Sequence, residues 1–384
     1  MSLQHGQLLI HSVCGTPLPL CVSAFRCILV PWHLPGGKGV GMRARAFYLF
    51  APYPVLVAWL MAWGTAWGAT PQGPASQAII DALTRANAAV VAVQVTAADG
   101  ARSADTLGRR RIGSGVVIGP DGLVLTIGYL MLEADSIQVE TQDRRTVPAV
   151  AVGYDIATGF GLVRPLFPLR VSPVPLGSEQ GLREGEPLIV VTGGGDGEVE
   201  VTQLVSKRAF SGYWEYHIDT ALFTSPPVAN HSGAPLFNQR GELLGIGSLF
   251  VSNARAALPP VPGNMFVPVD LLKPILAEMR QTGTTKQSRR PWLGLTSGEH
   301  GGQVQVVRVA TDSPAQAGGV EPGDVIVAVD GAPVATLEEF YKRVWSHAQP
   351  DDEIRLTVQH GEDRRELTLK GVDRMSTITK PAGI

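Results

Sequence analysis

Between residues 91 and 267 the sequence is a series of short apolar runs separated by turns, and this pattern limits the fold more than any other feature. The runs are rich in valine, leucine and isoleucine, and they are separated by glycine-containing clusters typical of tight turns. The runs are 91–95, 115–118, 123–126, 136–140, 147–152, 162–163, 188–191, 199–205, 216–218, 243–248 and 265–267. Many short strands at such spacing predict an all-β sandwich or barrel.

The flanking segments have other patterns. Residues 77–91 and 269–280 place apolar residues at helical spacing, which predicts a helix on each side of the β-rich region. Residues 283–290 are polar and predict a hinge. From 291 to 372 the pattern predicts a second, smaller unit of strands and two helices. One of these helices should begin at Thr336, because Thr-Leu-Glu-Glu forms a capping box there.

The first part of the chain differs in composition from the rest. Residues 1–68 contain no Asp or Glu and hold all three cysteines. A short basic stretch begins at Met42, and an apolar run from 46 to 67 follows it. This is the layout of a secretory signal peptide. We therefore expect a signal peptide at 42–68, with residues 1–41 a non-native or disordered leader.

An uncleaved membrane anchor is the alternative for the apolar run, because its length approaches the roughly 20 residues that a spanning helix needs. Both interpretations place the body of the protein outside the cytoplasm, in the periplasm or the extracellular space. The mature chain would contain no cysteine. Its stability must therefore come from packed cores and not from disulfides.

Charge and motif content exclude several classes of partner. The formal net charge is −2, and the sequence has no long run of Lys or Arg, so no nucleic-acid partner is predicted. It also lacks a phosphate-binding loop and the Cys/His spacing of a metal site. We therefore predict no cofactor and no metal.

The segment Ser-Gly-Ala-Pro-Leu at 232–236 looks like the nucleophile loop of a trypsin-like serine protease, Ser-Gly-Gly-Pro-Leu. A serine hydroxyl is a weak nucleophile at neutral pH unless an adjacent base takes its proton. Whether Ser232 can act therefore depends on a histidine and a carboxylate elsewhere in the chain.

Further motifs occur in the order of one family. They are Gly-Ser-Gly-Val-Val-Ile with Pro-Asp-Gly at 113–122, Pro-Leu-Gly-Ser at 175–178, Leu-Arg-Glu-Gly-Glu at 182–186, Gly-Glu-Leu-Leu-Gly-Ile at 241–246, Trp-Leu-Gly-Leu at 292–295, Ser-Pro-Ala at 313–315 and Glu-Pro-Gly-Asp-Val-Ile at 321–326. With the nucleophile loop, they make residues from about 110 to 372 resemble the HtrA/Deg family of trypsin-like serine proteases with a C-terminal PDZ domain.

The resemblance implies a fold and an activity. The fold would be mostly β, with a chymotrypsin-like double β-barrel at 77–281 and a small α+β PDZ domain at 288–372, followed by a tail at 373–384. The family consists of serine endopeptidases that commonly assemble as trimers through the protease domain. A homotrimer is therefore an expectation from resemblance.

The catalytic positions depart from the family pattern. The family's Leu-Thr-x-x-His reads Leu-Thr-Ile-Gly-Tyr here, which puts Tyr129 in place of the histidine. Its Thr-Asp-Leu-Ala reads Thr-Gly-Phe-Gly, which puts Gly159 in place of the aspartate. Tyrosine has a reference pKa of about 10 and does not readily accept a proton at neutral pH. The expected oxyanion hole is formed by Asn230, His231 and Ser232, with Asn230 in place of a glycine and able to adopt a left-handed backbone.

Two histidines could substitute as the base. His217 lies in the predicted strand before the nucleophile loop, and His231 directly precedes Ser232. A base must come within about 3 Å of the serine hydroxyl, which few histidines do. Most histidines at such positions are ordinary polar groups. A metal site that uses both histidines is weakly supported, since two ligands do not complete a coordination shell.

The PDZ segment predicts a peptide site. A PDZ domain binds an extended peptide as an added strand and holds its terminal carboxylate with backbone N–H groups. The carboxylate loop should be Trp292-Leu293-Gly294-Leu295, and the helix opened at Thr336 should offer Phe340 and Val344 to an apolar terminal side chain. The expected partners are peptides or unfolded proteins with hydrophobic C-termini.

Three functions follow as hypotheses. The first is an exported, proteolytically inactive protein that binds peptides through its PDZ domain. The second is an active serine endopeptidase with a rearranged triad around Ser232. The third is a chaperone or assembly scaffold that works as an oligomer.

Overall fold

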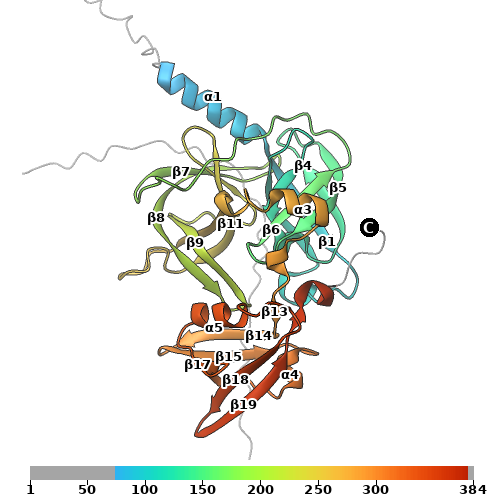
Figure 1. Ribbon diagram of the computed structural model, residues 1–384. Helices are drawn as coiled ribbons and strands as arrows, with labels where there is room; N and C mark the ends of the chain where they lie inside the picture. The colour runs from blue at the N-terminus through green and yellow to red at the C-terminus, as the bar shows by residue number, and fades with distance from the viewer. Residues whose placement is uncertain (1–73, 379–384) are drawn as a thin grey trace, which may run out of the picture. The chain divides into compact units, whose positions relative to one another are not determined.

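A computed structural model describes residues 74–378 (Figure 1). One helix, α1 (Pro74–Ala88), precedes two closed six-stranded barrels and a smaller sheet domain. The predicted fold class, mostly β with a double barrel followed by a small α+β domain, is confirmed. The expected leader and the expected signal peptide lie outside the described residues. In the described part of the chain, no helix is long and apolar enough to cross a membrane.

The first barrel closes in the strand order β1-β2-β3-β6-β5-β4. Its strands consist largely of valine, leucine and isoleucine, and β3 is buried along its whole length. β-branched side chains suit such pleated, buried surfaces. The strands are β1 (Val90–Ala97), β2 (Arg110–Val117), β3 (Val124–Ile127), β4 (Ala134–Glu140), β5 (Thr146–Tyr154) and β6 (Phe160–Pro165).

The second barrel closes in the order β10-β11-β12-β9-β8-β7. Its strands are β7 (Pro187–Val191), β8 (Val199–Gly212), β9 (Tyr216–Ser225), β10 (Pro235–Phe237), β11 (Leu243–Val251) and β12 (Gly263–Pro268). β8 and β9 form its longest hairpin, and the tip of this hairpin reaches helix α5 of the smaller domain (Figure 1). The main hydrophobic core draws residues from both barrels.

The smaller domain has a core of its own. Its main sheet has the order β14-β15-β16-β18-β19, and β17 pairs with β16. The elements are β13 (Pro291–Trp292), β14 (Leu295–His300), β15 (Gln303–Val309), α4 (Pro314–Ala317), β16 (Val325–Val329), β17 (Ala332–Pro333), α5 (Leu337–Val344), β18 (Glu353–His360), β19 (Asp363–Lys370) and β20 (Val372–Asp373).

Helix α5 begins where the capping box predicts. The Thr336 side chain accepts the Glu339 N–H at 3.1 Å, which satisfies one of the free donors of the first turn. The Glu339 carboxylate bonds back to the Ala335 N–H at 2.8 Å, one residue before the N-cap itself. Phe340, Tyr341 and Val344 are buried on the core side of this helix.

The helix expected at 269–280 is wrong as a single element. The segment forms a 3₁₀ turn at Val269–Leu271 and then helix α3 (Leu276–Thr282), which packs against β5. Pro274 lies between them. Proline has no N–H to donate and disfavours helical backbone in the residue before it, so one continuous helix cannot form.

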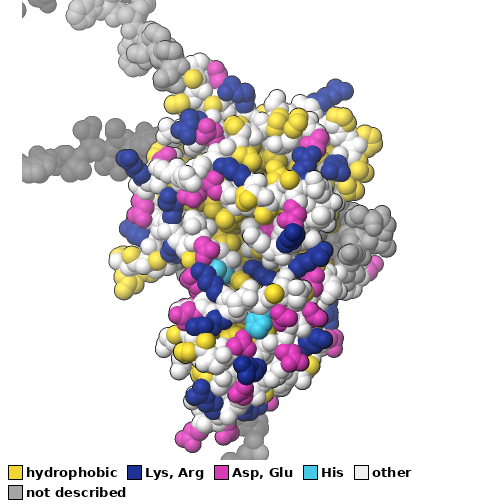
Figure 2. All heavy atoms as spheres, in the orientation of Figure 1, with side chains coloured by type: hydrophobic (Ala, Val, Ile, Leu, Met, Phe, Trp, Pro, Cys, Tyr) yellow, Lys and Arg dark blue, Asp and Glu magenta, His cyan; other side chains and the backbone are white. Residues whose placement is uncertain are grey.

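The polar segment expected to be a hinge is docked on the first barrel. Thr285 and Ser288 are buried, and both hydroxyls donate to one carboxylate oxygen of Asp155 at 2.5 Å. The other oxygen of Asp155 accepts the N–H and the hydroxyl of Thr158. The polarity of 283–290 therefore reflects a buried hydrogen-bond network. On the surface, acidic and basic side chains alternate over the face shown in Figure 2.

Candidate functional site

Ser232 lies in the loop between β9 and β10, and backbone contacts to both barrels hold it in place. Its carbonyl oxygen accepts the Ser114 N–H of β2 at 2.8 Å, and the next residue, Gly233, donates its N–H to Gly247 of β11 at 2.8 Å. Gly233 has φ +73°, and a Cβ there would lie 2.1 Å from the Ser114 carbonyl oxygen. Only glycine allows this close approach, so the conformation of the loop that presents Ser232 depends on Gly233.

Tyr129 is the group next to the Ser232 hydroxyl. It belongs to a 3₁₀ turn (Gly128–Met131) that follows β3. Its phenolic oxygen lies 2.7 Å from Ser232 Oγ and 3.0 Å from the carbonyl oxygen of Ser248. The residue that replaces the family histidine therefore lies where a general base would act.

The phenol cannot serve as that base at neutral pH. Burial raises the pKa of Tyr129 above its ordinary value, and the hydrogen bond with Ser232 acts in the opposite direction without cancelling this effect. The phenol keeps its single proton, and the Ser248 carbonyl can only accept one. When the phenol donates to Ser248, the Ser232 hydroxyl can donate to the phenolic oxygen. The arrangement fixes both hydroxyls and does not remove a proton from Ser232.

Gly159 lies beside the turn that carries Tyr129. Its carbonyl oxygen accepts the Gly128 N–H at 2.7 Å, and its φ is +86°. A Cβ would meet only ordinary contacts, the nearest at 3.6 Å, but side chains rarely adopt this backbone conformation. The nearby carboxylate of Asp155 accepts bonds from Thr158, Thr285 and Ser288. Asp155 is thus bonded to these groups, whereas the Tyr129 hydroxyl is bonded to Ser232 and Ser248.

Neither candidate histidine is bonded to Ser232. The ring of His231 turns back to the backbone, with Nδ1 3.1 Å from the Ala229 carbonyl oxygen, and burial lowers its pKa. His217 Nδ1 lies 2.9 Å from Ser211 Oγ, and its Nε2 lies 3.2 Å from an Asp219 oxygen. Both nitrogens of His217 are thus engaged away from the nucleophile loop.

The residues of the expected oxyanion hole, Asn230 to Ser232, lie in the loop before β10. Asn230 is exposed, and it does not use the left-handed backbone that asparagine can adopt. Within residues 74–378, the N–H groups of Asn230 and Ser232 have no bonded acceptor. Unpaired N–H groups beside a serine are the donors that an oxyanion needs. Asn230 and Ser232 can therefore offer N–H donors beside the Ser232 hydroxyl.

One cluster has the composition of a metal site but already contains a cation. Ligand atoms of His217, Asp219 and Glu338 lie within 4.8 Å of one another. The ammonium of Lys342 lies 2.7 Å from Asp219 and 2.8 Å from Glu338. Its bond to Asp219 raises the pKa of Lys342, and the same bond lowers that of Asp219. Lys342 supplies the positive charge, and His231 is not part of the cluster.

The predicted carboxylate loop lies between β13 and β14, and it already binds a carboxylate. The N–H groups of Gly294 and Leu295 both donate to Glu215 Oε1 at 2.7 Å, and the Leu293 N–H donates to Oε2 at 3.1 Å. Glu215 belongs to the tip of the β8–β9 hairpin in the second barrel. Burial raises its pKa, while these three N–H bonds act to lower it.

The other predicted groove residues are mostly buried. Phe340 and Val344 belong to the domain core, and Trp292 is half-buried. Gly294 has φ +84°, and a Cβ there would lie 2.2 Å from Ser313 Cβ. The glycine is therefore required for packing on Ser313 as well as for the loop conformation.

Comparison with known proteins identifies both domains. A model of the trypsin-like peptidase domain matches residues 113–246, and a model of the PDZ domain matches 291–370. A probable periplasmic serine endoprotease DegP-like from Hahella chejuensis is 28% identical over 248 residues, which cover 59% of this chain and 50% of the relative. The chain therefore contains a trypsin-like peptidase domain followed by a PDZ domain, and it is similar to HtrA/Deg proteases. A probable serine protease do-like from Buchnera aphidicola is 25% identical, with 62% and 52% covered.

Solved structures agree with the HtrA/Deg fold. A variant of the HtrA-type protease AlgW with tripeptide matches 79% of this chain and 98% of its own at TM-score 0.51 and 20% identity. The serine endoprotease from Yersinia pestis matches 79% and 99% at TM-score 0.50 and 21% identity. These similarities show the fold alone. The chain spans about half the length of the curated HtrA/Deg relatives it matches.

The HtrA/Deg motifs predict Ser232, Tyr129 and Gly159 as site positions, but they do not predict a role for Glu215. Spatially, the three motif positions meet at one place, through the Tyr129–Ser232 bond and the contact of Gly128 with Gly159. The only local signal for the Glu215 contact is the sequence Gly-Tyr-Trp-Glu-Tyr at 212–216. Three aromatic residues at a hairpin tip are unusual for a solvated turn and suggest a contact surface.

Proposed function

We propose that this HtrA/Deg protein is an exported pseudoprotease that binds peptides or protein C-termini through its PDZ domain. One observation carries the proposal: the hydroxyl next to Ser232 Oγ, at 2.7 Å, is that of a partly buried tyrosine and not a histidine. The names of the curated relatives support a periplasmic location.

The energetic argument concerns proton removal. A general base works best when its pKa lies near the operating pH, and burial moves the pKa of Tyr129 further from neutrality. In another serine protease, loss of the base alone lowers turnover by about a million-fold, nearly as much as loss of the whole triad. Gly159 removes the orienting carboxylate as well, so two of three catalytic functions are absent from the site.

Casein digestion tests the proposal. The full chain should leave unfolded casein intact over hours, at the same level as a Ser232→Ala variant. A Tyr129→His variant provides a positive comparison, because it places an imidazole beside the serine. Time-dependent cleavage by the unmodified protein that is lost in Ser232→Ala would overturn the proposal.

The alternative function is an active serine endopeptidase with His217 or His231 as a rearranged base. It requires either ring to leave its present partners, Ser211 and Asp219 for His217 or the 228–229 backbone for His231. If the alternative holds, any casein cleavage should disappear in His217→Ala or in His231→Ala. Cleavage that survives both changes would eliminate it.

Partners and assembly complete the proposal. The partners would be peptides or unfolded proteins with a free hydrophobic C-terminus, held at 292–295. A homotrimer and a membrane anchor at 42–68 are further proposals, supported only by family resemblance and by the apolar run. Mass measurement in solution tests the trimer and the scaffold function together, and a strict monomer would remove both. Fractionation of expressing cells tests the anchor.

A further inference from the structure

The tip of the β8–β9 hairpin, residues 213–215, lies in the PDZ domain at the place where a peptide would end. The contacts come from both walls of the groove. On the side of β14, the Ser297 N–H donates to the Tyr213 carbonyl oxygen at 3.0 Å. On the side of α5, the hydroxyl of Tyr341 donates to the Gly212 carbonyl oxygen at 2.7 Å and accepts the Glu215 N–H at 3.2 Å.

The carboxylate geometry matches that of a bound chain terminus. PDZ domains hold a terminal carboxylate with backbone N–H groups of the loop before the peptide-pairing strand. Here the three N–H groups of Leu293, Gly294 and Leu295 all bond to the carboxylate of Glu215. The Ser297–Tyr213 bond adds one backbone contact of the kind that joins an added strand to β14. A side-chain carboxylate and a nearby carbonyl thus take the places of a peptide terminus and its backbone.

Two local features are unfavourable unless the loop binds Glu215. The backbone φ of Glu215 is +57°, a left-handed conformation that costs about 1–2 kcal/mol for a residue other than glycine. It is also only 5% exposed, and a buried carboxylate without hydrogen bonds is strongly destabilising. Backbone strain of this kind persists only where the surrounding contacts determine it. The three N–H bonds and the Tyr341 contact are those contacts.

We propose that Glu215 is an internal ligand of the PDZ domain, so that the carboxylate loop is occupied in cis by the second barrel. An incoming partner is then a chain with a free C-terminal carboxylate that displaces the hairpin tip from the loop. This second step rests on the proposed peptide binding, whereas the occupancy itself does not.

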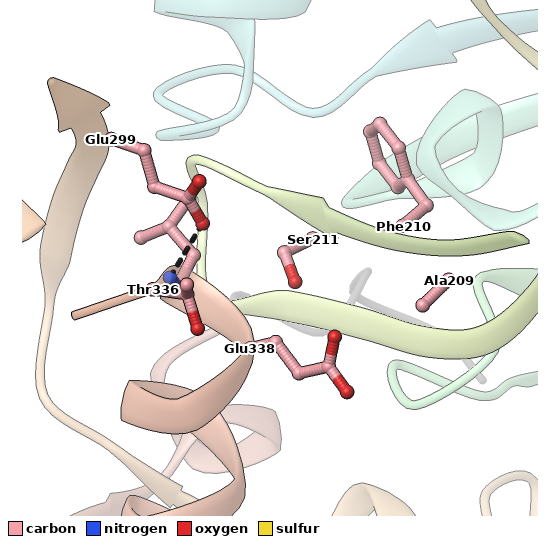
Figure 3. A pocket seen from close by; sticks show the side chains of 7 residues that line it. Ala209, Phe210, Ser211, Glu299, Thr336 and Glu338 are labelled. Atoms are coloured by element: carbon pink, nitrogen blue, oxygen red, sulfur yellow. Dashed lines mark hydrogen bonds between the residues drawn. The ribbon is translucent and has the colours of Figure 1, made fainter. Parts of the chain in front are cut away.

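An open cleft of about 440 Å³ adjoins the occupied loop and offers an entry. The PDZ domain contributes Glu299 and the first turn of α5 to its lining, and β8 contributes residues 209–211. In Figure 3 the Glu299 carboxylate points at the start of α5, where it accepts the Leu337 N–H at 2.7 Å. The cleft is lined by residues from the end of β14 and the start of α5, which is the end of the groove away from the carboxylate loop. A peptide could therefore contact the cleft before its C-terminus reaches the loop.

Amide hydrogen exchange of the full chain tests the occupancy without any ligand. Glu215→Gln keeps the side-chain volume but replaces one acceptor oxygen with an NH₂ group that opposes the loop donors. Glu215→Gly removes the carboxylate and also relieves the positive φ, so it serves if the first variant folds poorly. Glu198→Gln, an exposed change just before β8, is the matched control. Exchange of the 293–295 amides should become at least about ten-fold faster in both Glu215 variants.

Equal exchange at 293–295 in the unmodified protein, both Glu215 variants and the control would overturn the occupancy.

A fluorescent peptide with a free hydrophobic C-terminus then tests displacement, with its amidated form as the comparison. Because occupancy lowers apparent affinity by the closed fraction, Glu215→Gln should bind it at least about ten-fold tighter than the unmodified protein. Equal affinity would contradict the inference but support peptide binding. Released amides with no peptide binding would support the occupancy and contradict the proposed function.

Discussion

Ser232 and Tyr129 differ in what their hydroxyl groups can do, although only 2.7 Å separates the two oxygens. A serine becomes a nucleophile when its neighbour takes a proton, and a phenol with a raised pKa does the reverse, because it holds its own proton more firmly. The carbonyl of Ser248 gives that proton an acceptor. Under the proposed function, the Tyr129–Ser232 hydrogen bond is a structural contact, although its distance is that of a nucleophile–base pair.

The Tyr129 hydroxyl should make stability depend on alkaline pH. A group whose folded-state pKa is raised contributes stability that is present below its unfolded pKa, about 10, and is lost as pH rises through the folded value. Tyr129→Phe removes this hydroxyl and leaves the buried tyrosines, such as Tyr216 and Tyr341, in place. By urea unfolding, the unmodified protein should exceed the variant by about 1 kcal/mol at neutral pH, and the difference should shrink above about pH 10. A difference that grows with pH would contradict the assignment.

At the scale of elements, local signals predict the ends of helices better than they predict contacts. The capping box at Thr336 is confirmed, because a side chain and an N–H three residues apart determine it. Pro274 is also a local signal, because a proline at this place indicates that the helix expected at 269–280 is interrupted. The hairpin tip is different in kind. Its strands follow from their apolar pattern, but the partner of Glu215 lies about eighty residues later and is determined by the docking of two domains.

The carboxylate loop should depend on Gly294 for two separable reasons. A Cβ there meets Ser313 Cβ at 2.2 Å and also sits at φ +84°. Gly302, at φ +74° with nothing within 4 Å of a Cβ, isolates the backbone effect. Gly302→Ala should lower the free energy of unfolding by about 1–2 kcal/mol, and Gly294→Ala by several kcal/mol. Equal losses in urea unfolding would show that Ser313 moves aside easily.

At the scale of the whole molecule, a buried carboxylate binds the segment between the barrels and the PDZ domain. Asp155 is fully buried and binds Thr285 and Ser288 of that segment, together with Thr158 of its own turn. The sequence shows that residues 283–290 are polar, and this polarity fits a solvated hinge as well as it fits a docked segment. Only the three-dimensional neighbourhood distinguishes a solvated linker from a docked one. The family architecture, in contrast, was predictable, because its motifs are local and ordered along the chain.

Asp155→Ala should therefore destabilise the molecule much more than an exposed carboxylate change. It leaves buried hydroxyls of Thr285 and Ser288 without their acceptor, and we expect a loss of roughly 2–5 kcal/mol in the free energy of unfolding. Asp351→Ala, at an exposed position, should stay within about 0.5 kcal/mol. Chemical denaturation of the two variants checks this, and similar midpoints would argue that the segment is not docked.

The central claim is that Ser232 has the position of a nucleophile without being activated. Labelling of the full chain with a fluorophosphonate probe, with Ser232→Ala as the background, measures this directly, because only an activated serine reacts rapidly. The account predicts that the unmodified protein is labelled no more than the alanine variant across neutral pH. Rapid labelling of Ser232 above that background would contradict it.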